Sequence, residues 1–165
     1  IRAMSYPPYF WSEKDGERLS TQVKVLSLRN SMEATSVAAL MNSSLFYWWF
    51  ITLSDCRHLN MREVERFPVN LAAMATETAK NLHQICDSLM KSYQQNSVRK
   101  SATYRTTGSI AYDEYYPGMS KSIIDEIDLT IARHYDFSDQ ITDHLINFDI
   151  KFRMGAALFA EDEHK

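Results

Sequence analysis

Several features that are scarce in this 165-residue chain limit what it can be. Glycine and proline number four each, too few for the many turns of a β-sandwich or barrel, and this scarcity favours long helices. The two cysteines cannot form a disulfide framework, so we expect a reducing compartment. The length suits a single domain, residues 1–165, with a sizeable core.

Long apolar runs are also lacking. The longest, Val37 to Leu53, has 17 residues and is interrupted by the polar stretch Asn42 to Ser44. A membrane-spanning helix needs about 20 predominantly apolar residues. The first residues show no apolar core of a signal peptide. We therefore expect a cytoplasmic protein that does not contact a membrane.

Motifs for nucleotide binding and serine hydrolysis are missing, since the sequence contains no P-loop, no G-x-G-x-x-G and no G-x-S-x-G. Tyr6-Pro7-Pro8-Tyr9 differs from the Pro-Pro-aromatic loop of amino-group DNA methyltransferases. In that loop an Asn, Asp or Ser precedes the prolines and bonds the target amine. Tyr6 has no amide or carboxylate for this purpose, so we interpret the segment as a Pro-Pro loop braced by aromatic rings.

Charge is distributed unevenly along the chain. Residues 1–106 carry 13 Lys and Arg against 9 Asp and Glu, a net charge of +4, whereas residues 107–165 carry 5 against 12, a net charge of −7. The net charge of −3 disfavours a free-standing nucleic-acid binder. A polyanion would therefore meet the first two-thirds of the chain.

The pattern of apolar residues predicts a mainly helical α+β fold with a long central helix, a small β element and a helical C-terminal tail. Residues 1–100 form the part with the long helix, and residues 101–165 form short strands and C-terminal helices. The segments 5–11 and 15–19 are expected to be irregular, and the alternation in 20–28 predicts a strand. The expected helices are listed in chain order: one from Glu33, one from Ser43 or Ser44 to Leu53, a short turn from Asn60 with Glu63 in a capping box, a long helix over 70–97, and two over 120–135 and 138–147. A hairpin is expected within 99–118.

Three clusters could carry chemistry, and each has a plainer structural interpretation. Cys56, His58, His83 and Cys86 supply zinc-type ligands, but C-x-H is too tight for a usual knuckle and Cys86 lies next to apolar Ile85. Cys56 with His58 could also be a nucleophile and its base, although residues two apart in a loop seldom face each other. A carboxylate cluster, Asp125, Glu126 and Asp128, suits the early turns of a helix that begins at Ser120.

Basic, polar and aromatic residues interleave near residues 57–66 and 99–105, with Lys14 and Arg18 as further cations. Arg, Asn and His read base edges, whereas Lys and Arg hold phosphates. A solvated surface explains the same composition. The candidate DNA-binding residues are Arg57, His58, Asn60, Arg62, Arg99, Lys100, Tyr104 and Arg105.

Two stretches go beyond composition: LMNSSLFYWWFITLSDCRHLNMREVERFPV, residues 40–69, and SKSIIDEIDLTIARHYDFSDQITDHLINFDIKFRMG, residues 120–155. The first resembles the helix with an Asn-Ser-(Ser or Lys)-Leu-Phe-aromatic sequence, the polar loop and the Phe-Pro ending of target-recognition domains in type II restriction-modification DNA methyltransferases. The second resembles the C-terminal tail of the same enzymes, of the adenine-specific, combined methylase and endonuclease kind.

This resemblance implies that the chain is a recognition fragment that binds double-stranded DNA as part of a parent enzyme. It implies a preceding methyltransferase domain that uses S-adenosylmethionine, sometimes a nuclease domain, and no catalysis or cofactor in these 165 residues. It also implies that the aromatic helix is a stem presenting the polar loop 54–60. The alternative is a helical protein-interaction module without DNA contact.

Overall fold

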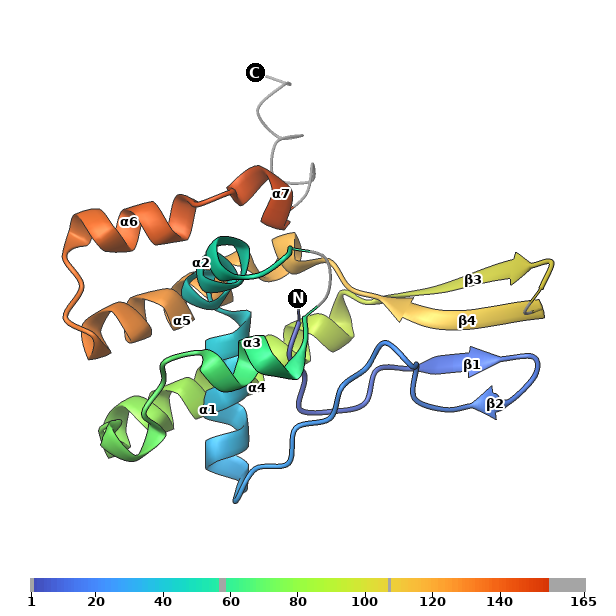
Figure 1. Ribbon diagram of the computed structural model, residues 1–165, viewed down its shortest axis with the longest axis horizontal. Coiled ribbons are helices and arrows are strands. Elements are labelled where there is room, and N and C mark those ends of the chain that lie inside the picture. Colours follow the sequence, from blue (N-terminus) through green and yellow to red (C-terminus); the bar gives the residue numbers. More distant parts are fainter. Residues whose placement is uncertain (1, 57–58, 107, 155–165) are drawn as a thin grey trace.

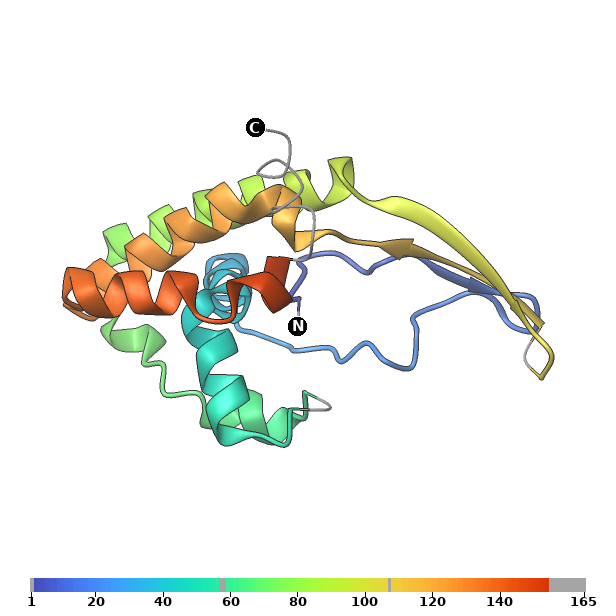
Figure 2. The ribbon, with the colours of Figure 1, turned by 90° about the horizontal axis from the view of Figure 1, so that it is seen from above.

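The structure is a computed structural model that describes residues 2–56, 59–106 and 108–154. Figures 1 and 2 show a body of helices from which a sheet of strands projects to one side. Helices account for 55% of the described residues. The fold is therefore mainly helical α+β, as the apolar pattern predicts.

The second helix follows a predicted capping residue, Ser43, whereas the first begins at Ser31, two residues before the predicted Glu33. α1 spans Ser31–Asn42, and the side chain of Asn30 accepts the N–H of Glu33 at 2.9 Å. α2 spans Ser44–Leu53, and the hydroxyl of Ser43 accepts the N–H of Phe46 at 3.1 Å. Capping satisfies N–H groups that have no partner inside the helix. Asn30 and Ser43 therefore fix where α1 and α2 begin.

The predicted long helix is shorter than expected. A 3₁₀ turn, η1, covers Leu71–Ala73, and α4 covers Thr76–Gln95. Met74 and Ala75 have extended ψ angles of 129° and 139°, which interrupt helical hydrogen bonding. This bend turns Met74 into the core, where it is 9% exposed. Tertiary burial thus overrides the helical pattern at this point.

The four strands of the described chain form one antiparallel sheet. β1 spans Phe10–Ser12, β2 Gly16–Glu17, β3 Val98–Tyr104 and β4 Gly108–Glu114, in the order β2-β1-β4-β3. The β3–β4 hairpin was predicted. The β1–β2 hairpin falls in segments predicted to be irregular, so that prediction was wrong.

The strand predicted for residues 20–28 is also wrong, because this segment runs without strand pairing between β2 and α1. Its alternating apolar residues do not share one buried face. Val23 is half-buried, whereas Val25, two positions later and therefore on the same face of a strand, is 71% exposed. Alternation alone therefore imitated a half-buried strand.

The C-terminal part contains η2 at Pro117–Ser120, α5 at Lys121–His134, α6 at Asp139–Asn147 and α7 at Ile150–Met154. The break between α6 and α7 includes Asp149 at a φ of 50°. One hydrophobic core joins α1, α4 and α5, and its fully buried side chains include Ala39, Leu82, Cys86, Leu89 and Ile127. Within the described ranges, no helix is both long and apolar enough to cross a membrane.

Candidate nucleic-acid interface

The aromatic helix α2 is a stem that anchors α3, the short helix Met61–Arg66. Phe46 is completely buried, and its ring meets Phe67 edge-on at 5.1 Å between centroids. Trp49 also packs edge-on against Phe67, at 5.8 Å between centroids, and donates its indole N–H to the carbonyl of Glu63 at 3.4 Å. The apolar run thus fixes the segment that carries the polar residues after it.

Asn60 and Glu63 form the predicted capping box at the start of α3. The carboxylate of Glu63 accepts the N–H of Asn60 at 2.9 Å and is also bonded by the guanidinium of Arg62 at 2.8 Å. Arg62 lowers the pKa of Glu63. The side chain of Asn60 is therefore used in holding the helix, while that of Arg62 remains 63% exposed and that of Arg66 is also exposed. Arg57 and His58 lie outside the described residues.

The second basic group lies on the projecting sheet, whose strands are β2, β1, β4 and β3 and which we call the arm. Arg99 on β3 is bonded to Asp113 on β4 at 2.5 Å, and its guanidinium covers the ring of Tyr9 at 3.4 Å from the centroid. Lys100 is 3.7 Å from Glu114. Both cations are thus engaged across the strands, which stabilises the pairing.

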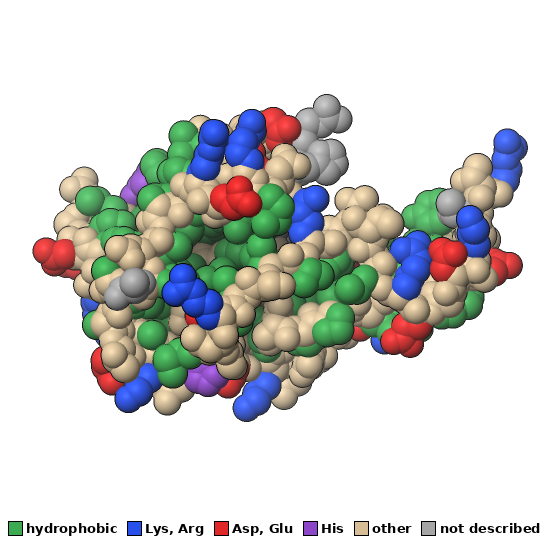
Figure 3. Space-filling model, turned by 60° about the horizontal axis from the view of Figure 1, so that its bottom comes forward, with side chains coloured by type: hydrophobic (Ala, Val, Ile, Leu, Met, Phe, Trp, Pro, Cys, Tyr) green, Lys and Arg blue, Asp and Glu red, His purple; other side chains and the backbone are tan. Residues whose placement is uncertain are grey.

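The free end of the arm has a different character. Tyr104 is 50% exposed, Arg105 is exposed, and Lys14 is exposed in the β1–β2 turn. Within the described ranges neither Lys14 nor Arg105 has an ion pair. Figure 3 shows Lys and Arg side chains at this end of the arm.

Glu13 and Ser109 join the two hairpin turns at this end of the arm, next to Gly108. Glu13 accepts the N–H of Ser109 at 2.7 Å, and the N–H of Glu13 bonds the carbonyl of Ser109 at 2.8 Å. Gly108 has a φ of 71°, and a Cβ there would lie 2.6 Å from Glu13 Oε2. The positive φ of this turn therefore favours glycine at this position.

The predicted site residues consequently fall into two separate groups. Arg62 lies on α3 at the helical body, whereas Arg99, Lys100, Tyr104 and Arg105 lie along the arm, which points away from that body in both views (Figures 1 and 2). Sequence reasoning named Lys14 only as a further cation. Its place beside the β3–β4 turn depends on the β1–β4 pairing, which no local sequence pattern shows.

The carboxylate cluster of α5 has separate structural roles. Asp125 pairs with Lys121 at 2.6 Å, and Glu126 is exposed. Asp128 is buried and accepts the backbone N–H of Ser44 at 2.7 Å as well as the hydroxyl of Ser44. The expected role at the start of their own helix is therefore wrong for Asp128, which instead caps the start of α2.

Arg153 of α7 completes this buried group by donating to the hydroxyl of Ser44 and, at 3.2 Å, to the carbonyls of Ile146 and Phe148. Burial raises the pKa of Asp128 to about 6, against the opposing effects of the Ser44 hydrogen bonds and Arg153. Burial also lowers the pKa of Arg153, while Asp128 acts in the opposite direction.

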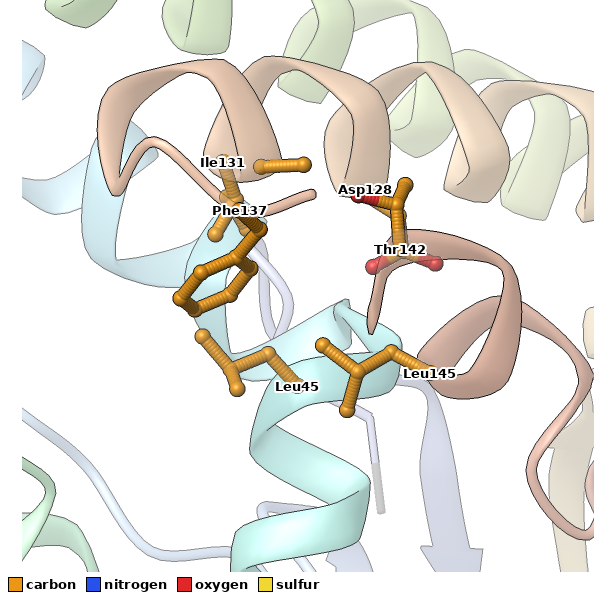
Figure 4. Close-up of a pocket in the computed structure, with 7 residues that line it drawn as sticks. Leu45, Asp128, Ile131, Phe137, Thr142 and Leu145 are labelled. Atoms are coloured by element: carbon orange, nitrogen blue, oxygen red, sulfur yellow. The ribbon is translucent and has the colours of Figure 1, made fainter. Parts of the chain in front are cut away.

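The cavity beside Asp128 is too small for a substrate. It measures about 10 Å³ and is lined by side chains that Figure 4 shows converging from α2, α5, α6 and the turn before α6. A single water needs a volume of about 10–15 Å³ on this measure. Asp128 therefore faces a packing gap, and its chemistry is that of a structural carboxylate.

The zinc and thiol alternatives gain no geometric support. Cys86 is completely buried, and burial raises its pKa to about 11. His83 bonds the hydroxyl of Thr35 at 2.9 Å, and Cys56 is exposed. Among the described residues, no three His, Cys, Asp or Glu side chains are grouped so that they could hold a metal ion.

Comparisons with known proteins add no family to this description. No protein-family model, curated protein or solved structure matches the chain.

Proposed function

We propose that this chain is the DNA sequence-recognition segment of a type II restriction-modification adenine methyltransferase. The observation that carries the proposal is the contact of Ser44 with Asp128 and Arg153. Ser44 belongs to the first stretch that resembles these enzymes, and the other two residues belong to the second stretch. Polar residues from both stretches therefore form one hydrogen-bonded unit, which is buried at Ser44 and Asp128.

This buried unit explains why polar residues are retained in an otherwise apolar core. Asp128 and Arg153 together hold the N-terminus of α2, and the opposite end of α2 leads to the polar loop and α3. A rigid support is what a recognition surface needs, because base-reading side chains must keep their positions relative to the duplex. In this proposal the motif residues build the support, and exposed cations on α3 and the arm meet DNA.

The chemistry belongs to another part of the enzyme in this proposal. A separate methyltransferase domain would bind S-adenosylmethionine and transfer the methyl group to adenine, while this chain would choose the sequence. The isolated chain should therefore not bind S-adenosylmethionine. Stoichiometric binding of the cofactor in a calorimetric titration would contradict this division of roles.

Selection from a randomised duplex library tests the recognition role. The net charge of −3 predicts weak binding by the isolated chain, so the chain is titrated to about 10⁻⁴ M, a range that non-specific dissociation constants reach, at about 50 mM salt, which strengthens phosphate contacts. Bound duplexes are sequenced. Enrichment of one sequence motif is the expected result, and binding without enrichment, or no binding, would contradict the proposal.

The alternative, a helical protein-interaction module, rests on one observation. An apolar groove of about 720 Å³ runs between residues 2–8, residues 19–28, α1 and α3, and it contains the exposed Val25. Exposed apolar surface of this kind commonly marks a protein contact. Absence of duplex binding at low salt would favour this second function.

A further inference from the structure

We propose, building on the recognition role, that the arm lies across the sugar–phosphate backbone of duplex DNA and that only its end enters a groove. The width of the sheet carries this inference. Three spacings between four strands amount to about 14 Å before side chains are added. The major groove is about 12 Å wide and admits a two-stranded ribbon. The complete sheet is therefore too wide to enter.

The end of the arm is narrower than the rest. β1 runs only to Ser12, opposite Ile110, and the following Glu13 bonds Ser109. β3 and β4 continue past that point to the pair Tyr104 and Gly108. The β1–β2 turn lies beside Ser109 and Gly108, so only the β3–β4 turn that carries Arg105 extends past it, and this turn has the width that a groove admits.

The cations of the arm divide along the same line, while two carboxylates at its end, Glu13 and Asp15, are bonded to Ser109 and Arg18. Arg18, Arg99 and Lys100 are paired with Asp15, Asp113 and Glu114 respectively. Trp11 pairs with both Glu17 and Ala111, and residues that pair across strands lie on the same face of the sheet. Glu17 is therefore on the face that carries Arg99, opposite to the face that carries Tyr104. The cations without an ion pair in the described chain, Lys14 and Arg105, are both at the end.

The chemistry and position of Arg105 and Lys14 assign different roles to these two cations. Arg105 follows directly on Tyr104 at the narrow end, and its planar guanidinium can bond the O6 and N7 of guanine together. Lys14 lies in the turn of the shorter β1–β2 hairpin, directly after Glu13, which bonds Ser109, and an ammonium there suits a phosphate. Arg105 is accordingly the base-reading residue of the arm, and Lys14 is a phosphate contact.

Four variants of the full chain test this assignment: Arg105→Ala, Arg105→Lys, Lys14→Ala and the control Lys80→Ala. Lys80 is exposed near the start of α4, far along that helix from the arm, and has no ion pair in the described chain. Each variant is passed through the duplex selection. Its affinity for the enriched duplex is then measured by fluorescence anisotropy at several salt concentrations.

Both Arg105 variants should lose discrimination at one base pair by about 5- to 100-fold, the range for one bidentate base contact. Arg105→Lys keeps the charge, so its loss distinguishes base reading from simple attraction. Lys14→Ala should keep the motif, weaken all duplexes alike, and lower the slope of log K against log salt by about one. Lys80→Ala should behave as the original chain.

Two kinds of failure are distinguishable. If the original chain enriches a motif that both Arg105 variants retain, the arm does not read bases and this inference is overturned while the recognition role stands. A salt slope that is unchanged in Lys14→Ala likewise removes the phosphate contact. If the original chain enriches no motif, the recognition role itself fails, and the inference fails with it.

Discussion

The backbone N–H of Ser44 is bonded to the carboxylate of Asp128 at 2.7 Å across 84 positions of sequence. This contact ties the first turn of α2 to the middle of α5. Because Asp128 is 6% exposed, water does not compensate for its loss, and the helix start depends on a partner that lies on another helix.

The stability of the protein should depend on pH through Asp128. Burial raises its pKa to about 6 from an ordinary value of 3.8, so the folded chain binds more protons than the unfolded chain between these values. Its stabilising contribution is complete below about pH 4 and is lost as pH rises through 6. The shift corresponds to about 3 kcal/mol at most.

Urea unfolding of the original chain and of Asp128→Asn at pH 4 and pH 7 measures this effect. The difference in unfolding free energy between the two proteins should be larger at pH 4. Glu126→Gln, an exposed change on the same helix, controls for loss of one charge and should show no such trend. A difference that grows towards pH 7 would mean that Ser44 and Arg153 hold Asp128 ionised.

Phe46 should be a major source of stability for the α2 stem. Its side chain is completely buried against Phe67, so Phe46→Ala should lower the unfolding free energy by about 3–5 kcal/mol through lost burial and the cavity that remains. Val25→Ala, at a position 71% exposed, is the control and should change it by less than about 0.5 kcal/mol. Equal effects in the two variants would argue against this packing.

Asn60 should act on stability, and not on sequence preference. Asn60→Ala removes the cap of α3 and should cost about 1 kcal/mol, whereas Asn60→Ser retains a capping oxygen and should restore most of it. Thermal unfolding and duplex selection on the same proteins decide the role. If Asn60→Ala keeps its melting temperature but changes the enriched motif, Asn60 reads a base.

The two thiols should differ in reactivity. Cys56 is exposed, while Cys86 is completely buried and its pKa is raised to about 11, so little thiolate forms. An aromatic disulfide reagent should therefore modify one thiol per native chain and both in urea. Cys56→Ser should abolish the reaction of the native protein. Rapid modification of Cys86 in native Cys56→Ser would contradict the core described above.

Local signals in the sequence predicted much of the fold. Ser43 and the Asn60–Glu63 pair mark helix starts, because a capping residue acts within one turn of its own helix. The β3–β4 hairpin followed from its β-forming residues around a glycine. Two predictions failed: β1 pairs with β4, which is distant in sequence, and the alternation in residues 20–28 has no strand partner.

The residues of the candidate site were likewise predictable where the signal is local in sequence, and not where it depends on distant contacts. Arg105 was identified from its basic and aromatic neighbours, but the position of Lys14 beside it required the pairing of β1 with β4. Composition also could not separate Arg99, which is fixed by Asp113 and Tyr9, from an unpaired arginine. Asp128 looked like part of an acidic cluster on its own helix, while its actual partner is Ser44.

Chemical-shift mapping tests the central claim most directly. ¹H–¹⁵N spectra of the full chain are recorded with and without a short duplex carrying the enriched motif. Recognition by α3 and the arm predicts shifts at Arg62, Arg66, Lys14, Tyr104 and Arg105, with Lys80 unaffected. A duplex that shifts no signal, or one that shifts only signals of α4 and α5, would contradict the account.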